Sequence, residues 1–328
     1  MGKRYLITGG AGFIGSAMVR KLVKDAENKI LNVDKLTYAS NLSSLNSVND
    51  LNNYEFHQID ICNFNKIKKI IEDFKPEIII NFAAESHVDR SIFSAQEFID
   101  SNIFGTYNLL ELCRFSNKKK EIIFHQISTD EVYGDIENNP SSTENDPYKP
   151  SSPYSATKAS ADHLVRAWSR TYKIPIFITN CSNNYGPFQN KEKLIPKVIT
   201  NILNNIDIPL YGSGEQIRDW IYVDDHIEGI LQVHRKGTFG ETYNIGGDNE
   251  IRNIDLIIKI IELINKIKKG SDKDLKNMKK LIVHVEDRLG HDKRYSINCE
   301  KIKSIGWKTK GIFENNLEKT IQWYLNEK

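Results

Sequence analysis

The chain has 328 residues, a formal net charge of +2, and 39% hydrophobic and 27% charged residues, which is ordinary for a globular protein that buries a sizeable core. So small a net charge argues against nucleic-acid binding through bulk charge, and no apolar run approaches the roughly 20 residues that span a bilayer. We therefore expect neither a nucleic-acid nor a membrane partner.

The cysteines at positions 62, 113, 181 and 299 are scattered along the chain. This spacing predicts that they form no metal site and that they are reduced thiols of a cytoplasmic protein. A strand pattern begins at Arg4, and we expect no signal peptide ahead of it.

The first 34 residues have the pattern of a dinucleotide site. Residues 4–8 are apolar, Gly9-Gly10-Ala11-Gly12-Phe13-Ile14-Gly15 follows, and residues 16–23 show helical periodicity. Glycines between a strand and a helix let the backbone approach a pyrophosphate at the helix N-terminus. A second apolar strand, 30–33, ends at Asp34, an acidic residue placed to bind the ribose hydroxyls of NAD and repel the 2′-phosphate of NADP. The alternatives are a plain tight turn and an ordinary strand-end carboxylate.

Later predicted strands are also followed by residues that could bind a ligand, and the carboxyl ends of strands are where open α/β sheets bind ligands. Strand 56–59 ends at Asp60-Ile61, and strand 77–82 ends at Ala83-Ala84, where small residues let the backbone pass close to a cofactor. His87 follows and is more typical of a structural histidine than of a catalyst. A single long helix over 98–115 would present Ser101 and Asn102 to the cofactor.

Residues 128–158 hold the densest group of catalytic residue types. Thr129, Asp130 and Glu131 follow an apolar strand, 121–127, and Tyr154 and Lys158 lie four residues apart at the start of a predicted helix. Side chains at that spacing share one helix face, and a lysine beside a phenol lowers the phenol's pKa toward working pH, which makes a general base. Two adjacent carboxylates push their pKa values apart and so supply an acid and a base. The alternatives are a solvated turn and an exposed helical pair.

Regular alternation of strands and helices continues to about residue 180 and then fades. This predicts an α/β fold with a doubly wound parallel Rossmann sheet and a smaller C-terminal mixed α/β substrate domain. We place the first domain at 1–180, with residues of roughly 221–250 returning to it, and the second mainly at 181–328. Within the second, residues 209–220 have the glycines of a hairpin, and 269–280 form a lysine-rich connector.

The motifs together resemble the extended short-chain dehydrogenase/reductase superfamily acting on nucleotide sugars. The glycine turn and Tyr154-x-x-x-Lys158 carry the superfamily resemblance. Four further stretches look like the dTDP-glucose 4,6-dehydratases, with Thr129-Asp130-Glu131 the most specific element: 32–38, 84–91, 128–134 and 216–220. The resemblance covers essentially the whole chain and implies a homodimer that uses NAD to convert dTDP-glucose to dTDP-4-keto-6-deoxyglucose and water.

The resemblance also implies how the residues share that reaction, which proceeds by C4 oxidation, C5/C6 elimination and hydride return to C6. Tyr154 takes the proton from the sugar O4, Lys158 holds the phenolate and the nicotinamide ribose, and Thr129 bonds O4. Glu131 removes the C5 proton, and Asp130, kept protonated by its neighbours, donates to the departing C6 hydroxyl.

The remaining site residues are carried over position by position. Cofactor binding is assigned to Gly9, Gly12, Phe13, Ile14, Gly15, Asp34, Lys35, Thr37, Asp60, Ile61, Ala83, Ala84, Ser101, Tyr154, Lys158 and Asn184. Substrate binding is assigned to Ser86, Thr129, Asn183, Lys193, Leu194, Pro209, Tyr211, Arg218, Asn253, Arg288 and His291. For the charged members of the second group, the alternative is a surface salt bridge.

Two other functions remain open at this point. A related dehydratase, decarboxylase or epimerase acting on a UDP or GDP sugar would share the first oxidation step. A protein that binds NAD only for sensing or regulation would tolerate loss of Tyr154, Lys158 or the acidic pair, and all of them are present.

Overall fold

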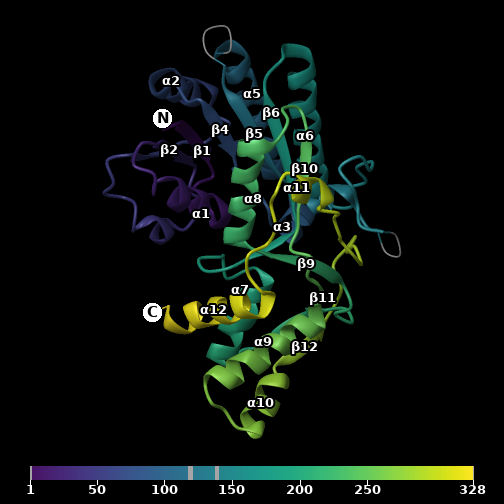
Figure 1. Cartoon of the computed structure of the whole chain (residues 1–328). Helices are drawn as coiled ribbons and strands as arrows, with labels where there is room; N and C mark the ends of the chain where they lie inside the picture. The colour runs from purple at the N-terminus through teal and green to yellow at the C-terminus, as the bar shows by residue number, and fades with distance from the viewer. Residues whose placement is uncertain (1, 117–120, 137–139, 328) are drawn as a thin grey trace.

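A seven-stranded parallel sheet forms the centre of the computed structural model, which describes residues 2–116, 121–136 and 140–327 (Figure 1). Its order is β10-β6-β5-β4-β1-β2-β3, and every neighbouring pair runs parallel. The strands are β1 (Arg4–Thr8), β2 (Lys29–Asp34), β3 (Tyr54–Gln58), β4 (Ile78–Asn81), β5 (Ile123–Thr129), β6 (Ile176–Cys181) and β10 (Thr242–Ile245). The predicted doubly wound Rossmann sheet is confirmed.

Helices cover both faces of this sheet because its strands are apolar on both sides. Successive strand residues point to opposite faces. Ile7 accordingly packs in one core with α1 (Phe13–Leu22) and α8 (Val223–Lys236). Its neighbour Leu6 packs in the other, with α2 (Phe64–Phe74), α5 (Gly105–Ser116) and α6 (Pro153–Tyr172). Because α8 and β10 belong to this layer, residues beyond 220 return to the first sheet.

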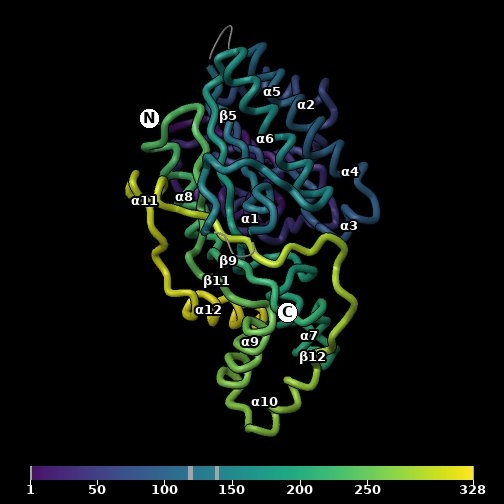
Figure 2. The backbone as a smooth tube through the Cα atoms, turned by 90° about the vertical axis from the view of Figure 1, so that its right-hand side faces the viewer, coloured from purple at the N-terminus to yellow at the C-terminus, as the bar shows by residue number. Residues whose placement is uncertain are grey.

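A third core lies below the sheet in Figures 1 and 2 and is built from the later part of the chain. Its strands are β7 (Asn183–Tyr185), β9 (Ile217–Tyr222) and β11 (Glu250–Arg252), which form one sheet, and β8 (Ile208–Tyr211) and β12 (Ile282–Val285), which form another. Its helices are α7 (Leu194–Asn204), α9 (Asn253–Ile267), α10 (Asp272–Lys279) and α12 (Phe313–Asn326); a short α11 (Glu300–Ser304) packs against β10.

Three predictions about local structure are wrong. Residues 209–220 do not form a hairpin, because β8 pairs with β12 and β9 pairs with β7 and β11. The lysine-rich connector contains helix α10, whose N-terminus has a capping box formed by Ser271 and Asp274. The single α-helix predicted over 98–115 is instead a run of three helical segments: α4 (Gln96–Phe98), a π-helical stretch η2 (Ile99–Phe104) and then α5.

The π-helical stretch lies beside the predicted site. Within it, the Asn102 amide bonds the backbone N–H and C=O of Glu85 and the Thr157 hydroxyl, at 2.9–3.1 Å. π-Helical turns occur frequently at functional sites, and this one ties the loop after β4 to helix α6. The remaining short elements are η1 (Leu42–Leu45), α3 (Val88–Phe93) and η3 (Asp130–Tyr133). Across the described ranges, the structure contains no helix long and apolar enough to cross a bilayer.

Candidate active site

A pocket lies along the carboxyl ends of the parallel strands, where the sequence places both predicted functions. All of the residues assigned to cofactor binding line it, and so do the five assigned catalytic residues. Its lining also includes residues that the sequence reasoning missed: Val33, Ala39, Ser40, Ile59, Phe82, Glu85, Ile127, Ser128, Cys181, Ser182, Gln189 and Asn190. Half of these are direct neighbours of predicted residues in the sequence, so the strand-end rule could have found them.

The glycine turn is shaped for close approach of a ligand to the backbone. Gly9 has a φ of +68°, and a Cβ there would lie 2.6 Å from the Ala83 backbone nitrogen. A Cβ on Gly15 would lie 2.3 Å from the Gly9 carbonyl oxygen. The α1 N-cap, Gly12, makes no side-chain cap hydrogen bond. No side chain therefore caps the first N–H groups of α1, which leaves these donors able to bind a pyrophosphate.

Replacing Gly9 with alanine should weaken NAD binding at least tenfold and lower stability by about 1–3 kcal/mol, because the new methyl group meets backbone atoms at a positive φ. Calorimetric titration with NAD and thermal unfolding would measure both effects. Gly240→Ala is the matched control, since its φ is +90° but nothing lies within 4 Å of the new methyl. It should lose some stability and keep NAD affinity; equal losses of affinity in the two variants would contradict the close-approach argument.

Asp34 is positioned by the backbone around it. Its carboxylate accepts hydrogen bonds from the N–H of Ala11 (3.0 Å) and of Leu36 (2.8 Å). Leu36 has a φ of +61°, an unusual conformation for a non-glycine residue that is found at ligand sites. The adjacent Lys35 ammonium contacts the Glu85 carboxylate at 3.1 Å and donates to Ser101. Because Glu85 compensates that charge, Lys35 offers little to a 2′-phosphate, which favours NAD over NADP.

The acidic pair begins a short helical turn at the end of β5. Thr129 caps this turn: its hydroxyl accepts from the Glu131 N–H at 3.3 Å and donates to Asp130 at 3.3 Å. Helix α6 begins alongside, fixed by a capping box at Ser152 and Pro153 in its first turn, and the Tyr154 N–H donates to Ser91. Strand end and helix start therefore bring the carboxylates, the phenol and the ammonium of Lys158 into one pocket.

The two carboxyl groups experience different electrostatic environments. Burial, then the charge of Glu131, raises the pKa of Asp130 well above its ordinary value, and its Oδ2 is buried without a hydrogen-bond partner. Burial also raises the pKa of Glu131, but the cations Arg218 and Lys193 oppose that rise. A protonated Asp130 beside an ionisable Glu131 is an acid and base pair of the predicted kind.

In this arrangement the pKa of the Tyr154 phenol is raised, not lowered as its spacing to Lys158 predicts. Burial, then the charge of Glu131, raises the pKa of Tyr154 well above 10. The Lys158 ammonium donates instead to the Ile127 carbonyl at 2.6 Å, and burial lowers its own pKa. A further positive charge in the pocket is needed to favour the phenolate.

The predicted substrate residues fall into two groups. Ser86, Thr129, Asn183 and Lys193 line the pocket, and the Lys193 ammonium donates to the Ser86 carbonyl at 3.0 Å. The others are outside its described lining: Leu194, Pro209, Tyr211, Arg218, Asn253, Arg288 and His291.

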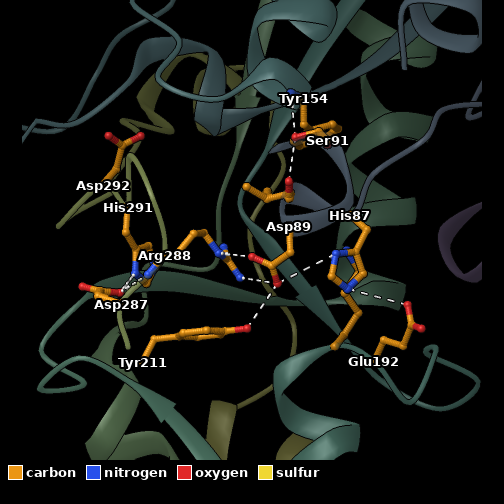
Figure 3. A network of polar contacts seen from close by, with 12 residues as sticks. His87, Asp89, Ser91, Tyr154, Glu192, Tyr211, Asp287, Arg288, His291 and Asp292 are labelled. Atoms are coloured by element: carbon orange, nitrogen blue, oxygen red, sulfur yellow. Dashed lines mark hydrogen bonds and ion pairs between the residues drawn. The ribbon is translucent and has the colours of Figure 1, made fainter. Parts of the chain in front are cut away.

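Several of this second group are engaged with protein groups. Arg218 is buried and donates to the carbonyls of Ile217 (2.8 Å) and Asp292 (2.9 Å). Arg288 pairs with Asp89, and His291 with Asp287 at 2.6 Å (Figure 3). The structure thus collects the reacting groups in one pocket and leaves these seven predicted substrate contacts outside its described lining.

Comparisons with known proteins agree with this geometry. A family model described as GDP-mannose 4,6 dehydratase matches residues 6–320. A curated dTDP-glucose 4,6-dehydratase of Salmonella typhimurium is 49% identical over 338 residues, covering 98% of this chain and 92% of the relative.

Solved structures give the same result. The chain resembles dTDP-glucose 4,6-dehydratase from Bacillus anthracis in complex with NAD, at 42% identity and a TM-score of 0.86, covering 98% of this chain and 96% of that one. It also resembles the enzyme of that name from Streptomyces venezuelae, solved with NAD and a TDP ligand, at 39% identity and a TM-score of 0.90, covering 98% and 97% of the two chains.

Proposed function

This chain belongs to the dTDP-glucose 4,6-dehydratase family, and from that premise we propose that it converts dTDP-glucose to dTDP-4-keto-6-deoxyglucose and water with NAD as its cofactor. The observation that carries the proposal is the placement of Asp130 and Glu131 in the same pocket as Tyr154 and Lys158. An oxidation alone needs only the phenol and the ammonium. Loss of water from C5 and C6 needs an additional acid and base.

NAD, when bound, would accept the C4 hydride and return it to C6, and its cationic nicotinamide would help to lower the pKa of Tyr154. The glycine turn and Asp34 would hold its pyrophosphate and a ribose. Tyr154 would then take the proton from O4 of the sugar, and Thr129 would bond that oxygen. Lys158 would stabilise the phenolate.

The acidic pair would perform the elimination. A ketone at C4 acidifies the C5 hydrogen, which Glu131 would remove as a proton. Asp130, whose raised pKa keeps it protonated, would donate its own proton to the C6 oxygen as it leaves as water. The charges of Arg218 and Lys193 favour ionised Glu131. Arg218 also acts to lower the pKa of Asp130, but there burial and the charges of Glu131 and Asp219 outweigh it.

The purified protein should be incubated separately with dTDP-glucose, UDP-glucose and GDP-mannose. Alkali-induced ultraviolet absorbance of the keto sugar would identify the substrate consumed. We expect dTDP-glucose to be consumed fastest by at least tenfold. Faster turnover of another sugar nucleotide would replace the substrate and keep the chemistry, and release of an epimer without water loss would contradict the dehydratase assignment.

We also propose a cytoplasmic homodimer. The four cysteines are unpaired, which suits a reducing compartment. Phe104, Tyr107 and Phe115 lie at helical spacing along η2 and α5 and are 40–55% exposed. Tyr172 of the adjacent α6 is also exposed, and the two helices pack side by side (Figure 2). An exposed apolar surface of this kind marks a protein interface, and self-association of α5 and α6 through a two-fold axis would cover it.

Replacing Tyr107 with glutamate should convert a dimer to monomers, as measured by light scattering during gel filtration, because the charge would be buried in the apolar contact. Phe239→Glu is the control, since Phe239 is 54% exposed but lies in the turn before β10. A Tyr107→Glu protein with the mass of the wild type would contradict this interface.

A further inference from the structure

Asp89 and Arg288 form an ion pair between parts of the chain separated by 199 residues. Arg288 Nε lies 2.5 Å from Asp89 Oδ1, and Nη2 donates to Oδ2 at 3.2 Å. We propose that Asp89 is a latch residue: it competes with the diphosphate of the nucleotide sugar for Arg288, so that this pair opens when the substrate binds and closes when the product leaves. The inference rests on the proposed function, because it takes a nucleotide diphosphate as the ligand of Arg288.

The two partners come from different parts of the fold. Asp89 lies on α3, just after the end of β4 in the large parallel sheet, whereas Arg288 lies in the segment after β12, which belongs to the C-terminal sheets. Tyr211, at the end of β8, reinforces the contact: its hydroxyl donates to Asp89 Oδ2 at 3.3 Å, and its ring lies 5.1 Å from the guanidinium carbon of Arg288 (Figure 3). The latch therefore joins the two halves of the molecule beside the reacting groups.

The Asp89 carboxylate and a diphosphate would compete for the Arg288 guanidinium. A guanidinium binds a carboxylate and a phosphate through the same fork of N–H donors. Arg288 is within electrostatic range of the pocket, since its charge lowers the pKa values of Glu131 and Lys193. A diphosphate delivered there would meet the Asp89 carboxylate as a like charge at short range. Binding of the diphosphate would therefore compete with the Asp89 contact, which occupies Nε and Nη2 of Arg288.

The rest of the polar network can persist when the latch opens. His87 lies 4.0 Å from Asp89 and 3.6 Å from Glu192, and Glu192 pairs with Arg90 at 2.8 Å. None of these contacts involves Arg288 (Figure 3). The Asp89 and Arg288 side chains are 26% and 22% exposed, so water can replace Arg288 beside the carboxylate. A pair of this exposure contributes modestly to stability, and we expect competition to weaken nucleotide binding about 3- to 10-fold.

The test is the affinity of NAD-saturated protein for dTDP, measured calorimetrically. Asp89→Asn should bind dTDP about 3- to 10-fold more tightly than wild type, and both KM and kcat for the nucleotide sugar should fall because the product leaves more slowly. Glu192→Gln removes a neighbouring negative charge without touching Arg288 and should change dTDP affinity less than twofold. Unaltered NAD affinity verifies that each variant is folded.

A second pair of variants tests the mechanism of competition. In an Arg288→Gln background, adding Asp89→Asn should no longer tighten dTDP binding, because the contested group is gone. Weaker or unchanged dTDP binding by Asp89→Asn overturns the latch and would assign Asp89 to holding Arg288 in place. If wild type binds UDP or GDP but not dTDP, the proposed substrate fails and the latch is measured with that nucleotide. If it binds none of the three, both proposals are overturned.

Discussion

Replacing Tyr154 with phenylalanine is expected to lower turnover of the nucleotide sugar by about 10²- to 10⁴-fold, the usual contribution of a general base, while NAD still binds. The variant keeps the ring that packs edge-on against Phe98 at 6.4 Å and loses only the hydroxyl. Keto-sugar formation at saturating substrate would give the rate, and calorimetric titration would give the NAD affinity. Turnover within threefold of wild type would show that another group accepts the O4 proton.

The pH profile provides a second readout of the same change. The phenol must lose its proton to act as a base, and in this pocket burial and Glu131 raise its pKa. Activity should therefore rise with increasing pH as the phenol ionises, and that rising limb should be absent from the residual activity of Tyr154→Phe. Tyr148→Phe is the control, because it also removes a hydrogen-bonded, half-buried hydroxyl, one bonded to Asp162, but Tyr148 does not line the pocket as described.

The sheet and the dinucleotide turn could be predicted because their signals are local. The glycine turn after β1 and the strand end at Asp34 are each recognised from a few consecutive residues, and the topology of parallel strands then places them together. The acidic pair could be placed by the same rule, since residues after β5 must lie at the same edge of the sheet as those after β1 and β4.

The ionisation of Tyr154 could not be predicted from its spacing to Lys158. The spacing places both residues on one helix face, but the pKa of Tyr154 depends on burial and on Glu131, which comes from another element. The Lys158 ammonium bonds the Ile127 carbonyl. The false hairpin at 209–220 has a similar origin. Its glycines indicate turns, whereas the pairing of β8 with β12 joins Ile208 to Ile282, a contact that no local pattern reports.

The contact between Arg288 and Asp89 could not be predicted from the sequence for the same reason. An arginine in a polar segment indicates an anionic partner, and the resemblance to nucleotide-sugar enzymes implied that this partner is the diphosphate of the substrate. Asp89 is 199 residues away, and only the fold brings α3 against the segment after β12.

Replacing Glu131 with glutamine should abolish removal of the C5 proton while leaving the first oxidation step possible. The amide has nearly the same shape as the carboxylate but cannot accept a proton at neutral pH. We expect overall turnover to fall by about 10²- to 10⁴-fold and incorporation of solvent deuterium at C5 to fall with it. Oxidation at C4, followed by the near-ultraviolet absorbance of the reduced cofactor, should fall far less, so the reduced cofactor should accumulate.

Asp130→Asn is the matched comparison, because it alters the other member of the pair. Asparagine cannot supply the proton that the C6 oxygen needs, so water loss should slow, yet the C5 proton should still exchange through Glu131. The two variants should thus separate proton removal from water loss within one pocket. Normal C5 exchange in Glu131→Gln, or exchange lost only in Asp130→Asn, would reverse the two assignments; the raised pKa of Asp130 is the physical reason to expect Asp130 as the acid and Glu131 as the base.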